Sequence, residues 1–279
     1  MYTLEIRYST HPDHAKTFTT EDIRKHYLIE ELFVPGEIKL VYSMEERAIT
    51  GGITPIEESI SLKGNDQMKA EYFLERREVG IFNVGGTGTI TVDGETFDME
   101  NKDCLYIGLG KQELLFSSES AASPAKFYLY SAPAHKEYPT QHVAFKDIEG
   151  DRLGALETAN DRVIRRMIHK EGIQSCQVVM GMTQLSAGSV WNSMPTHTHD
   201  RRSEVYLYID LDESARMFHM MGEPTQTRHI VMKNEQAVIS PPWSIHCGAA
   251  TSNYTFIWAM AGDNKTYNDM DQVTMDELR

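Results

Sequence analysis

A succession of short segments rich in β-branched and aromatic residues is the feature that most constrains this chain. Gly, Pro, Asn and Asp separate the segments and favour turns between them. An Asp93-Gly94 pair inside one segment is a strong signal for a two-residue hairpin. Because strands do not alternate with helices, the pattern predicts an all-β sandwich or barrel. The predicted strands are 38–43, 69–75, 88–99 with its hairpin, 126–132, 176–185, 204–211, 215–221, 228–232, 236–240 and 254–261.

One helix is predicted ahead of the strands. It begins at Thr19 or Thr20, where a hydroxyl can cap the first turn and acidic residues follow directly. Ile23, Tyr27 and Leu32 share its apolar face. The early chain is therefore expected to contribute a short helix to an otherwise β-rich fold.

The predicted strands fall into two runs, roughly 38–133 and 176–262. A polar stretch over 142–172, with a helical tendency, lies between them. A chain of 279 residues is long enough for two domains of about 140 residues each. The sequence therefore predicts two barrels, over 1–150 and 151–279. A shared coarse plan in the two runs favours a duplicated fold.

The charge of the chain restricts its partners. The formal net charge is −14, with 41 Asp and Glu against 27 Lys and Arg. Such a surface repels phosphate backbones, so neither nucleic acid nor an anionic membrane is expected as a partner. A small anionic substrate remains compatible with this charge if a local basic pocket receives it.

Cysteine usage and the start of the chain indicate a cytoplasmic protein. Cys104, Cys176 and Cys247 are widely spaced and form no CxxC pair, which is typical of free thiols in a reducing compartment. The first residues contain no apolar run of signal-peptide length. No segment approaches the roughly 18 apolar residues that a membrane span requires.

The segment PTHTHDRRSEVYLYIDL is the most informative part of the sequence. His197 and His199 are two residues apart on a predicted strand, so both imidazoles point to one face. Glu204 follows at the start of the next strand, and His246 ends the later segment SPPWSIH. Three imidazoles and one carboxylate suit a divalent ion such as zinc, with nitrogens at about 2.0–2.1 Å. This combination is the two-part metal signature of cupin barrels.

The first run of strands has no comparable histidine pair, so the first barrel is predicted to be metal-free. Cys247 adjoins the distal ligand but should point to the opposite strand face. It is expected to be a structural neighbour rather than a ligand. His219 and His229 lie on predicted strands. They are expected either to pack against other side chains or to contact the metal ligands without binding the ion themselves.

Arginines near the ligands are candidates for substrate binding. Arg201 and Arg202 lie between the ligands, and Arg228 precedes a later strand. A guanidinium beside a metal grips a carboxylate in bidentate fashion, whereas the alternative is an ordinary surface arginine. At least one of the three is predicted to hold an anionic substrate.

Four longer strings resemble the 5-keto-4-deoxyuronate isomerases, or 4-deoxy-L-threo-5-hexosulose-uronate ketol-isomerases, of the cupin superfamily. They are LIEELFVPGEIKLVYS, HTHDRRSEVYLYIDL, MFHMMGEPTQTRHIVMKNEQAVIS and WSIHCGAATSNYTFIWAMAGDN. The resemblance implies two cupin barrels, a homohexamer and one zinc per chain, held by His197, His199, Glu204 and His246. One departure is visible, because Met44 stands where the family often has a histidine.

The resemblance also implies a reaction in pectin breakdown. The family converts 5-dehydro-4-deoxy-D-glucuronate to 3-deoxy-D-glycero-2,5-hexodiulosonate by moving a proton from C2 to C1 through an enediol. A zinc ion stabilises the charge that develops on the two oxygens. The general base remains unassigned, with Glu223, Asp200 and a zinc-bound hydroxide as candidates.

Two other functions remain open at this stage. Iron could occupy the same four ligands in a cupin dioxygenase, since histidine and carboxylate serve both metals. A double cupin that binds sugar without catalysis is the second alternative. Oxygen uptake would distinguish the first alternative, and uronate binding without turnover would favour the second.

Overall fold

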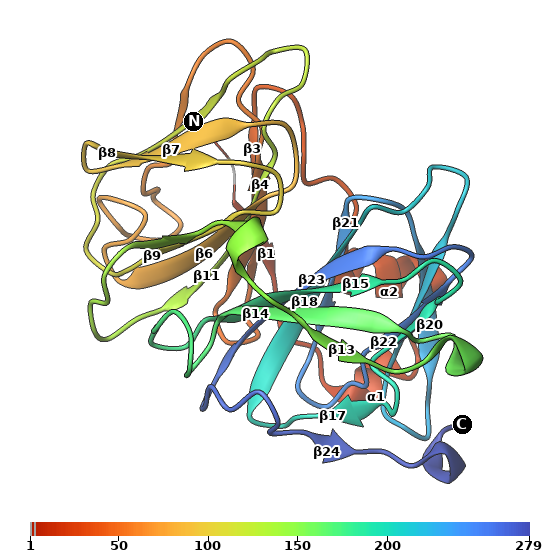
Figure 1. Ribbon diagram of the computed structural model, residues 1–279. Coiled ribbons are helices and arrows are strands. Elements are labelled where there is room, and N and C mark those ends of the chain that lie inside the picture. The colour runs from red at the N-terminus through yellow and green to blue at the C-terminus, as the bar shows by residue number, and fades with distance from the viewer. Residues whose placement is uncertain (1, 3) are drawn as a thin grey trace. The chain divides into compact units, whose positions relative to one another are not determined.

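The computed structural model describes residue 2 and residues 4–279 (Figure 1). Its described part contains two α-helices, α1 (Pro12–Ala15) and α2 (Thr20–Tyr27). Three 3₁₀ turns lie at Phe145–Asp147, Leu156–Thr158 and Met275–Glu277. All other regular elements are strands, which confirms the all-β prediction.

The predicted helix is shorter than its sequence pattern indicated. Thr19 caps α2 through a reciprocal capping box with Asp22, and Ile23 and Tyr27 are buried. The chain then turns directly into strand β2 (Leu28–Ile29), so Leu32 lies outside the helix. Residues 28–29 form a strand rather than a further helical turn because Leu28 and Ile29 pair with β21, where the sheet satisfies their backbone hydrogen bonds.

The chain divides into two compact units. Unit 1 consists of the described residues up to Arg7, Glu31–Glu149 and Met167–Val179, and unit 2 of Tyr8–Glu30, Gly150–Arg166 and Met180–Arg279. The division differs from a single predicted joint near residue 150. Residues 8–30 join unit 2, where β2 extends a sheet, and residues 167–179 join unit 1.

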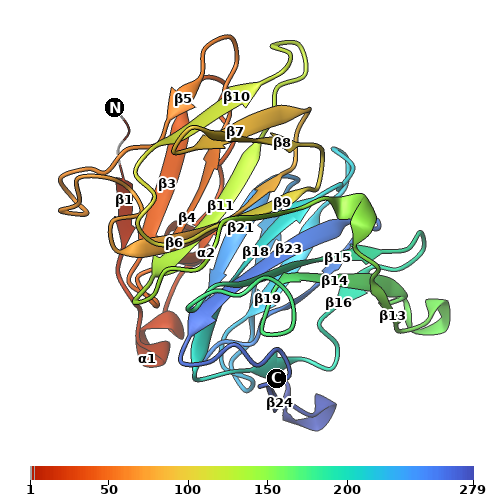
Figure 2. The same cartoon turned by 60° about the vertical axis from the view of Figure 1, so that its left-hand side comes forward.

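Unit 1 is a sandwich of two sheets, which we call the first barrel. The large sheet has the order β1-β3-β4-β11-β6-β9-β12 and the small sheet β5-β10-β7-β8. Figure 2 shows the small sheet lying over one face of the large one. Buried Ile81 and Leu129 of the large sheet and Ile90 and Phe116 of the small sheet belong to one apolar core. The strands are β1 Leu4–Arg7, β3 Ile38–Ser43, β4 Ile49–Ile53, β5 Ile60–Ser61, β6 Arg77–Asn83, β7 Gly88–Val92, β8 Glu95–Met99, β9 Cys104–Ile107, β10 Leu114–Ser118, β11 Phe127–Pro133 and β12 Gln141–Val143.

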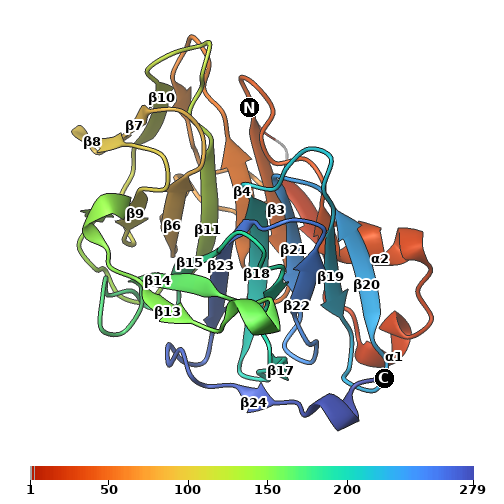
Figure 3. The ribbon, with the colours of Figure 1, turned by 45° about the vertical axis from the view of Figure 1, so that its right-hand side comes forward.

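Unit 2 repeats this plan as the second barrel. Its large sheet has the order β13-β14-β15-β23-β18-β21-β2 and its small sheet β16-β22-β19-β20 (Figure 3). An extra pair, β17 with β24, lies beside them. In sheet order, β6 therefore corresponds to β18, and β11 to β23. The strands are β13 Asp151–Leu153, β14 Arg162–Ile168, β15 Val179–Leu185, β16 Trp191–Asn192, β17 His197–Thr198, β18 Arg202–Ile209, β19 Met217–Met221, β20 Arg228–Met232, β21 Gln236–Ser240, β22 Cys247–Ala250, β23 Thr255–Gly262 and β24 Asp271–Gln272.

Two sequence predictions are wrong in detail. Residues 69–75 form turns rather than a strand, since Lys69 has a φ of +50° and the Glu75 amide donates to the Tyr72 carbonyl over 3.2 Å, which bends the backbone. The stretch over 142–172 contains β13 and β14 rather than an α-helix. The Asp93-Gly94 hairpin is confirmed, with positive φ at both residues, as a type I′ turn requires.

Candidate metal centre

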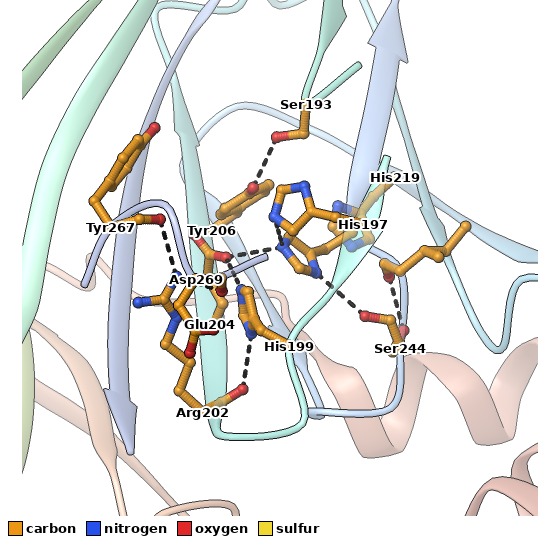
Figure 4. A network of polar contacts seen from close by, with 12 residues as sticks. Ser193, His197, His199, Arg202, Glu204, Tyr206, His219, Ser244, Tyr267 and Asp269 are labelled. Atoms are coloured by element: carbon orange, nitrogen blue, oxygen red, sulfur yellow. Dashed lines mark hydrogen bonds and ion pairs between the residues drawn. The ribbon is translucent and has the colours of Figure 1, made fainter. Parts of the chain in front are cut away.

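Four side chains from separate segments converge inside unit 2 (Figure 4). His197 lies on β17, His199 directly follows that strand, Glu204 lies on β18 and His246 immediately precedes β22. One ligand atom from each residue lies within 4.8 Å of the others. Among the described residues, these four make up the group of histidine, cysteine and acidic side chains able to share an ion.

A tight turn brings His199 next to Glu204. The Arg202 amide donates to the carbonyl of His199 over 3.2 Å, which closes the turn between β17 and β18. The same segment orients the imidazole, because Nδ1 of His199 lies 2.9 Å from the Arg202 carbonyl oxygen. The four residues between His199 and Glu204 therefore comprise the turn residues Asp200 and Arg201 and the first two residues of β18.

Backbone carbonyls select the nitrogen that each histidine presents. Nδ1 of His246 lies 3.2 Å from the Ser244 carbonyl, as Nδ1 of His199 does from Arg202. A carbonyl only accepts, so each Nδ1 donates and each Nε2 is the nitrogen that faces the cluster. Both Nε2 atoms point at Oε2 of Glu204, at 2.9 Å from His246 and 3.1 Å from His199. Such carbonyl-anchored imidazoles are typical of metal ligands.

The surroundings of His197 and Glu204 favour the metal-binding form of these two side chains. Burial, followed by the neighbouring His246, lowers the pKa of His197 to about 3, so this imidazole is neutral. Burial alone would raise the pKa of Glu204, but His246 and His199 outweigh it and hold that pKa well below its usual range. Neutral imidazoles and a carboxylate are the donors that divalent ions prefer. The residues present therefore fit a bound metal ion.

A cavity of about 240 Å³ opens onto the cluster. Its walls combine the aromatic rings of Tyr206, Trp258 and Tyr267 with the guanidinium groups of Arg162 and Arg202. This combination of apolar surface, cations and a metal-binding cluster is typical of a site for a small anionic molecule.

Arg202 holds one wall of this cavity in place. It is 1% exposed, and its terminal nitrogens donate to the carbonyls of Thr266, Tyr267 and Asp269 at 2.8, 3.1 and 3.2 Å. Tyr267 lines the cavity. Arg202 therefore fixes the 266–269 segment against the site.

The other predicted arginines lie elsewhere. Arg201 forms ion pairs with Asp269 and Asp271, both at 2.7 Å, and does not line the cavity. Arg228 donates to the Phe18 carbonyl and lines a different, much smaller cavity together with Glu223. Asp200 is exposed outside the cavity. Of the three predicted arginines, the structure thus brings Arg202 to the site.

Arg162 is a site residue that sequence reasoning missed. It lies on β14 and lines the cavity, with Nη1 donating to the Asn160 carbonyl over 2.9 Å. The predicted helical tendency of this stretch obscured it. The β-branched pair Val163-Ile164 beside it was the available signal for a strand.

The remaining predicted neighbours are buried or remote. His219 is buried, and its Nδ1 lies 2.9 Å from the Tyr208 hydroxyl. Cys247 packs with Ile245 outside the four-ligand group, and burial raises the pKa of its thiol. His229 is exposed on β20.

Sequence comparisons match almost the whole chain. A family model described as the KduI/IolB family matches residues 28–277. The 4-deoxy-L-threo-5-hexosulose-uronate ketol-isomerase of Bacillus pumilus is 56% identical over 276 residues, with 99% of this chain and 100% of the relative covered. The enzyme of the same name from Bacillus subtilis is 49% identical, with the same coverage of both chains. The resemblance found in the sequence is confirmed.

Solved structures share the fold. An IolB-like protein of Salmonella typhimurium has a TM-score of 0.68 at 15% identity and covers 88% of this chain and 96% of its own. An oxalate decarboxylase variant of Bacillus subtilis has a TM-score of 0.54 at 9% identity and covers 78% and 70%. These likenesses support the prediction of two cupin barrels. In the described part of the chain, no helix has the length and apolarity to cross a bilayer.

Proposed function

This chain belongs to the KduI/IolB family, and on that premise we propose that it is a zinc-dependent isomerase of uronate degradation. It converts 4-deoxy-L-threo-5-hexosulose uronate, also called 5-dehydro-4-deoxy-D-glucuronate, to 3-deoxy-D-glycero-2,5-hexodiulosonate. Its ketol-isomerase class rests on full-length relatives of that name at 49–56% identity. The observation that carries the assignment of the site is the three-histidine, one-glutamate cluster at the end of an arginine-bearing cavity.

The reaction moves one hydrogen from C2 to C1 and one from the C2 oxygen to the C1 oxygen, and it leaves the composition unchanged. The C2 proton leaves, the C1 oxygen is protonated to give an enediol, and a proton returns at C1 while the C2 hydroxyl becomes a ketone. A zinc ion bound to the four ligands would supply Lewis-acid stabilisation of the negative charge on the two oxygens. No net oxidation occurs, which fits a redox-inactive ion.

Tyr206 is suited to hold a substrate oxygen rather than to remove a proton. Its side chain lines the cavity on the same face of β18 as Glu204, and its hydroxyl lies 2.9 Å from Oγ of Ser193. Burial raises the pKa of Tyr206 well above its ordinary value, so the phenol keeps its proton. Glu223 and Asp200 lie outside the cavity and are therefore not placed to act as the general base. A zinc ion held by the four ligands would lower the pKa of a bound water, so it could supply the base.

Arg162 is our candidate for holding the substrate carboxylate. Arg202 commits its terminal nitrogens to three carbonyls, whereas Arg162 commits one nitrogen to Asn160. A guanidinium group whose other N–H groups donate to no protein acceptor can bind a carboxylate through two hydrogen bonds. In a chain of net charge −14, such a local cation offsets the unfavourable field for an anionic substrate.

An isomerisation assay with metal analysis tests this proposal. The purified protein should carry close to one zinc per chain and interconvert the two ketouronates without nicotinamide or oxygen. Arg162→Gln should lose about 1.5–3 kcal/mol of transition-state binding, roughly ten- to hundredfold in kcat/KM, at unchanged zinc content. Arg216→Gln, outside the cavity, is the matched control. A zinc-loaded parent without turnover would overturn the function, and an unaffected Arg162→Gln would overturn the carboxylate assignment alone.

The two alternative functions, a dioxygenase and a sugar-binding protein, predict other results. An iron-dependent dioxygenase would consume oxygen after reconstitution with iron, because the same ligands accept that metal. A sugar-binding double cupin would bind the ketouronate without converting it.

We further propose that the protein is a cytoplasmic homohexamer that acts in pectin degradation. A monomer in light scattering at micromolar concentration would contradict the assembly.

A further inference from the structure

A second cavity lies in the first barrel, wholly within unit 1. It has a volume of about 230 Å³, and its lining includes Tyr42, Met68 and Phe73 together with Arg47, Arg76 and Arg77. None of the lining residues is an aspartate or glutamate. A volume below roughly 300 Å³ suits a small ligand rather than a drug-sized one.

Arg77 is a buried cation that pairs with no carboxylate of the described residues. The residue is 7% exposed, and its guanidinium donates to Oγ and the carbonyl of Ser131 at 3.1 and 2.8 Å and to the Arg47 carbonyl at 2.7 Å. Its carbon Cζ lies 5.6 Å from the centre of the Tyr42 ring. Burial lowers the pKa of Arg77 to about 10, so the group is still charged at neutral pH. A buried charge of this kind is expensive unless an anion compensates it.

Two further cations strengthen the positive field. The Arg47 side chain is exposed at the cavity and makes no hydrogen bond or ion pair with a described residue. Arg76 binds the carbonyls of Met68 and Lys69 and pairs with Glu75 over 2.9 Å. Among the described residues, only Arg76 of these three arginines forms an ion pair with a carboxylate, so the cavity carries local positive charge on a chain of net charge −14.

The cavity occupies the end of the first barrel that corresponds to the metal centre in the second. Arg77 is the first residue of β6, and it shares a strand face with the core residues Val79 and Ile81. In the second barrel, Arg202 begins the corresponding strand β18, and Glu204 follows it. The end that carries ligands for a cation in one barrel thus carries cations in the other.

We propose that the cavity of the first barrel binds a small organic carboxylate. Arg47, whose guanidinium no described residue engages, holds the carboxylate group, Arg77 adds a buried positive charge beside it, and Tyr42, Met68 and Phe73 contact the body of the molecule. Planar guanidinium forks match a carboxylate in geometry as well as in charge. The binding site is independent of the isomerase activity, which the second barrel carries.

Isothermal titration calorimetry of the zinc-loaded protein tests the proposal with D-galacturonate and D-galactose as a matched pair. They share a ring and differ at C6, where one has a carboxylate and the other a hydroxymethyl group. D-galacturonate should bind, and D-galactose should not. Arg47→Gln should weaken one galacturonate site roughly tenfold, whereas Lys170→Gln, an exposed cation of unit 1 outside the cavity, should not change it.

Arg77→Gln is the second variant, because it removes the buried positive charge beside the carboxylate. It should also weaken that site, and circular dichroism establishes that it is folded. Stoichiometry separates this site from binding at the metal centre, which both variants leave intact. Galacturonate binding that is unchanged in Arg47→Gln, or absent in the parent, overturns the proposal. Inorganic phosphate binding that depends on Arg47, without galacturonate binding, overturns the carboxylate as ligand.

Discussion

The two barrels have the same strand plan but different side chains at the same end, where, among the described residues, three histidines and a glutamate come together in the second barrel alone. In the second, β18 places Glu204 among three histidines, and in the first, β6 places Arg77 in a cavity with two more arginines. Both strands lie between corresponding neighbours, β11 and β9 in one barrel and β23 and β21 in the other. The comparison teaches that a few residues at one barrel end set the kind of ligand, while the strand plan stays constant.

The interiors behind these ends also differ. Val79 and Ile81 continue the inner face of β6 as apolar core, whereas Tyr206 and Tyr208 continue the inner face of β18. Tyr208 then contacts buried His219 at 2.9 Å. The second barrel therefore exchanges part of its apolar core for hydrogen-bonding rings that orient the site, a common compromise at functional sites.

Loss of a metal ligand should have the largest effect, because it removes zinc binding and turnover from the second barrel and leaves the first barrel unchanged. His246→Ala should weaken zinc binding at least a thousandfold and abolish turnover, since changes behind the ligands alone cost ten- to hundredfold. Elemental analysis after dialysis and the isomerisation assay measure this. His229→Ala, an exposed histidine of the same unit, is the control. Full zinc loading of His246→Ala would contradict the ligand assignment.

Glu78 should give a large effect confined to unit 1. Its carboxylate is fully buried, with Oε1 accepting from the amides of Gln177 and Val178 and Oε2 from the amide of Cys176 and the Tyr106 hydroxyl, all at 2.6–2.8 Å. In Glu78→Gln, an NH₂ group replaces one carboxylate oxygen, so the two donors that faced this oxygen lose their acceptor. The loss should be about 3 kcal/mol, at roughly 1.5 kcal/mol for each charge-assisted bond.

Hydrogen exchange in β6 and β9 measures this change, because faster amide exchange reports local loss of stability. The three tryptophans of the chain, Trp191, Trp243 and Trp258, all lie in unit 2 and report that unit separately by fluorescence. Glu95→Gln, exposed on β8, is the control. Loss of zinc in Glu78→Gln would show that the two units are not energetically separate.

The helix cap should give the smallest effect. Oγ of Thr19 accepts from the Asp22 amide over 3.2 Å, and Thr19→Ala should destabilise α2 by about 1 kcal/mol. Because α2 belongs to unit 2, the tryptophan fluorescence midpoint in urea should fall. Thr20→Ala is the matched control, and equal shifts in both variants would show that the capping hydroxyl contributes nothing.

Local chemistry made some elements predictable and left others open. Residues 38–43 and 228–232 were predicted as strands with the bounds that β3 and β20 have, since alternation and β-branching agree there. Segment 69–75 forms turns, and its sequence KAEYFLE contains none of the β-branched residues that mark the two confirmed strands. Strand β14 was missed because its three arginines, Arg162, Arg165 and Arg166, interrupt its apolar residues.

The sequence by itself determined the all-β class, the family and the four residues of the metal cluster. HxH, a glutamate at turn distance and a distal histidine are a local pattern, and ligand chemistry limits which residue types can form it. The tertiary structure alone decided that Arg162 rather than Arg201 reaches the cavity, and that Arg77 is a buried cation that pairs with no carboxylate of the described residues. An arginine has a long flexible side chain, so its role depends on which carbonyls and carboxylates the packed strands bring within reach, and residue spacing does not specify these.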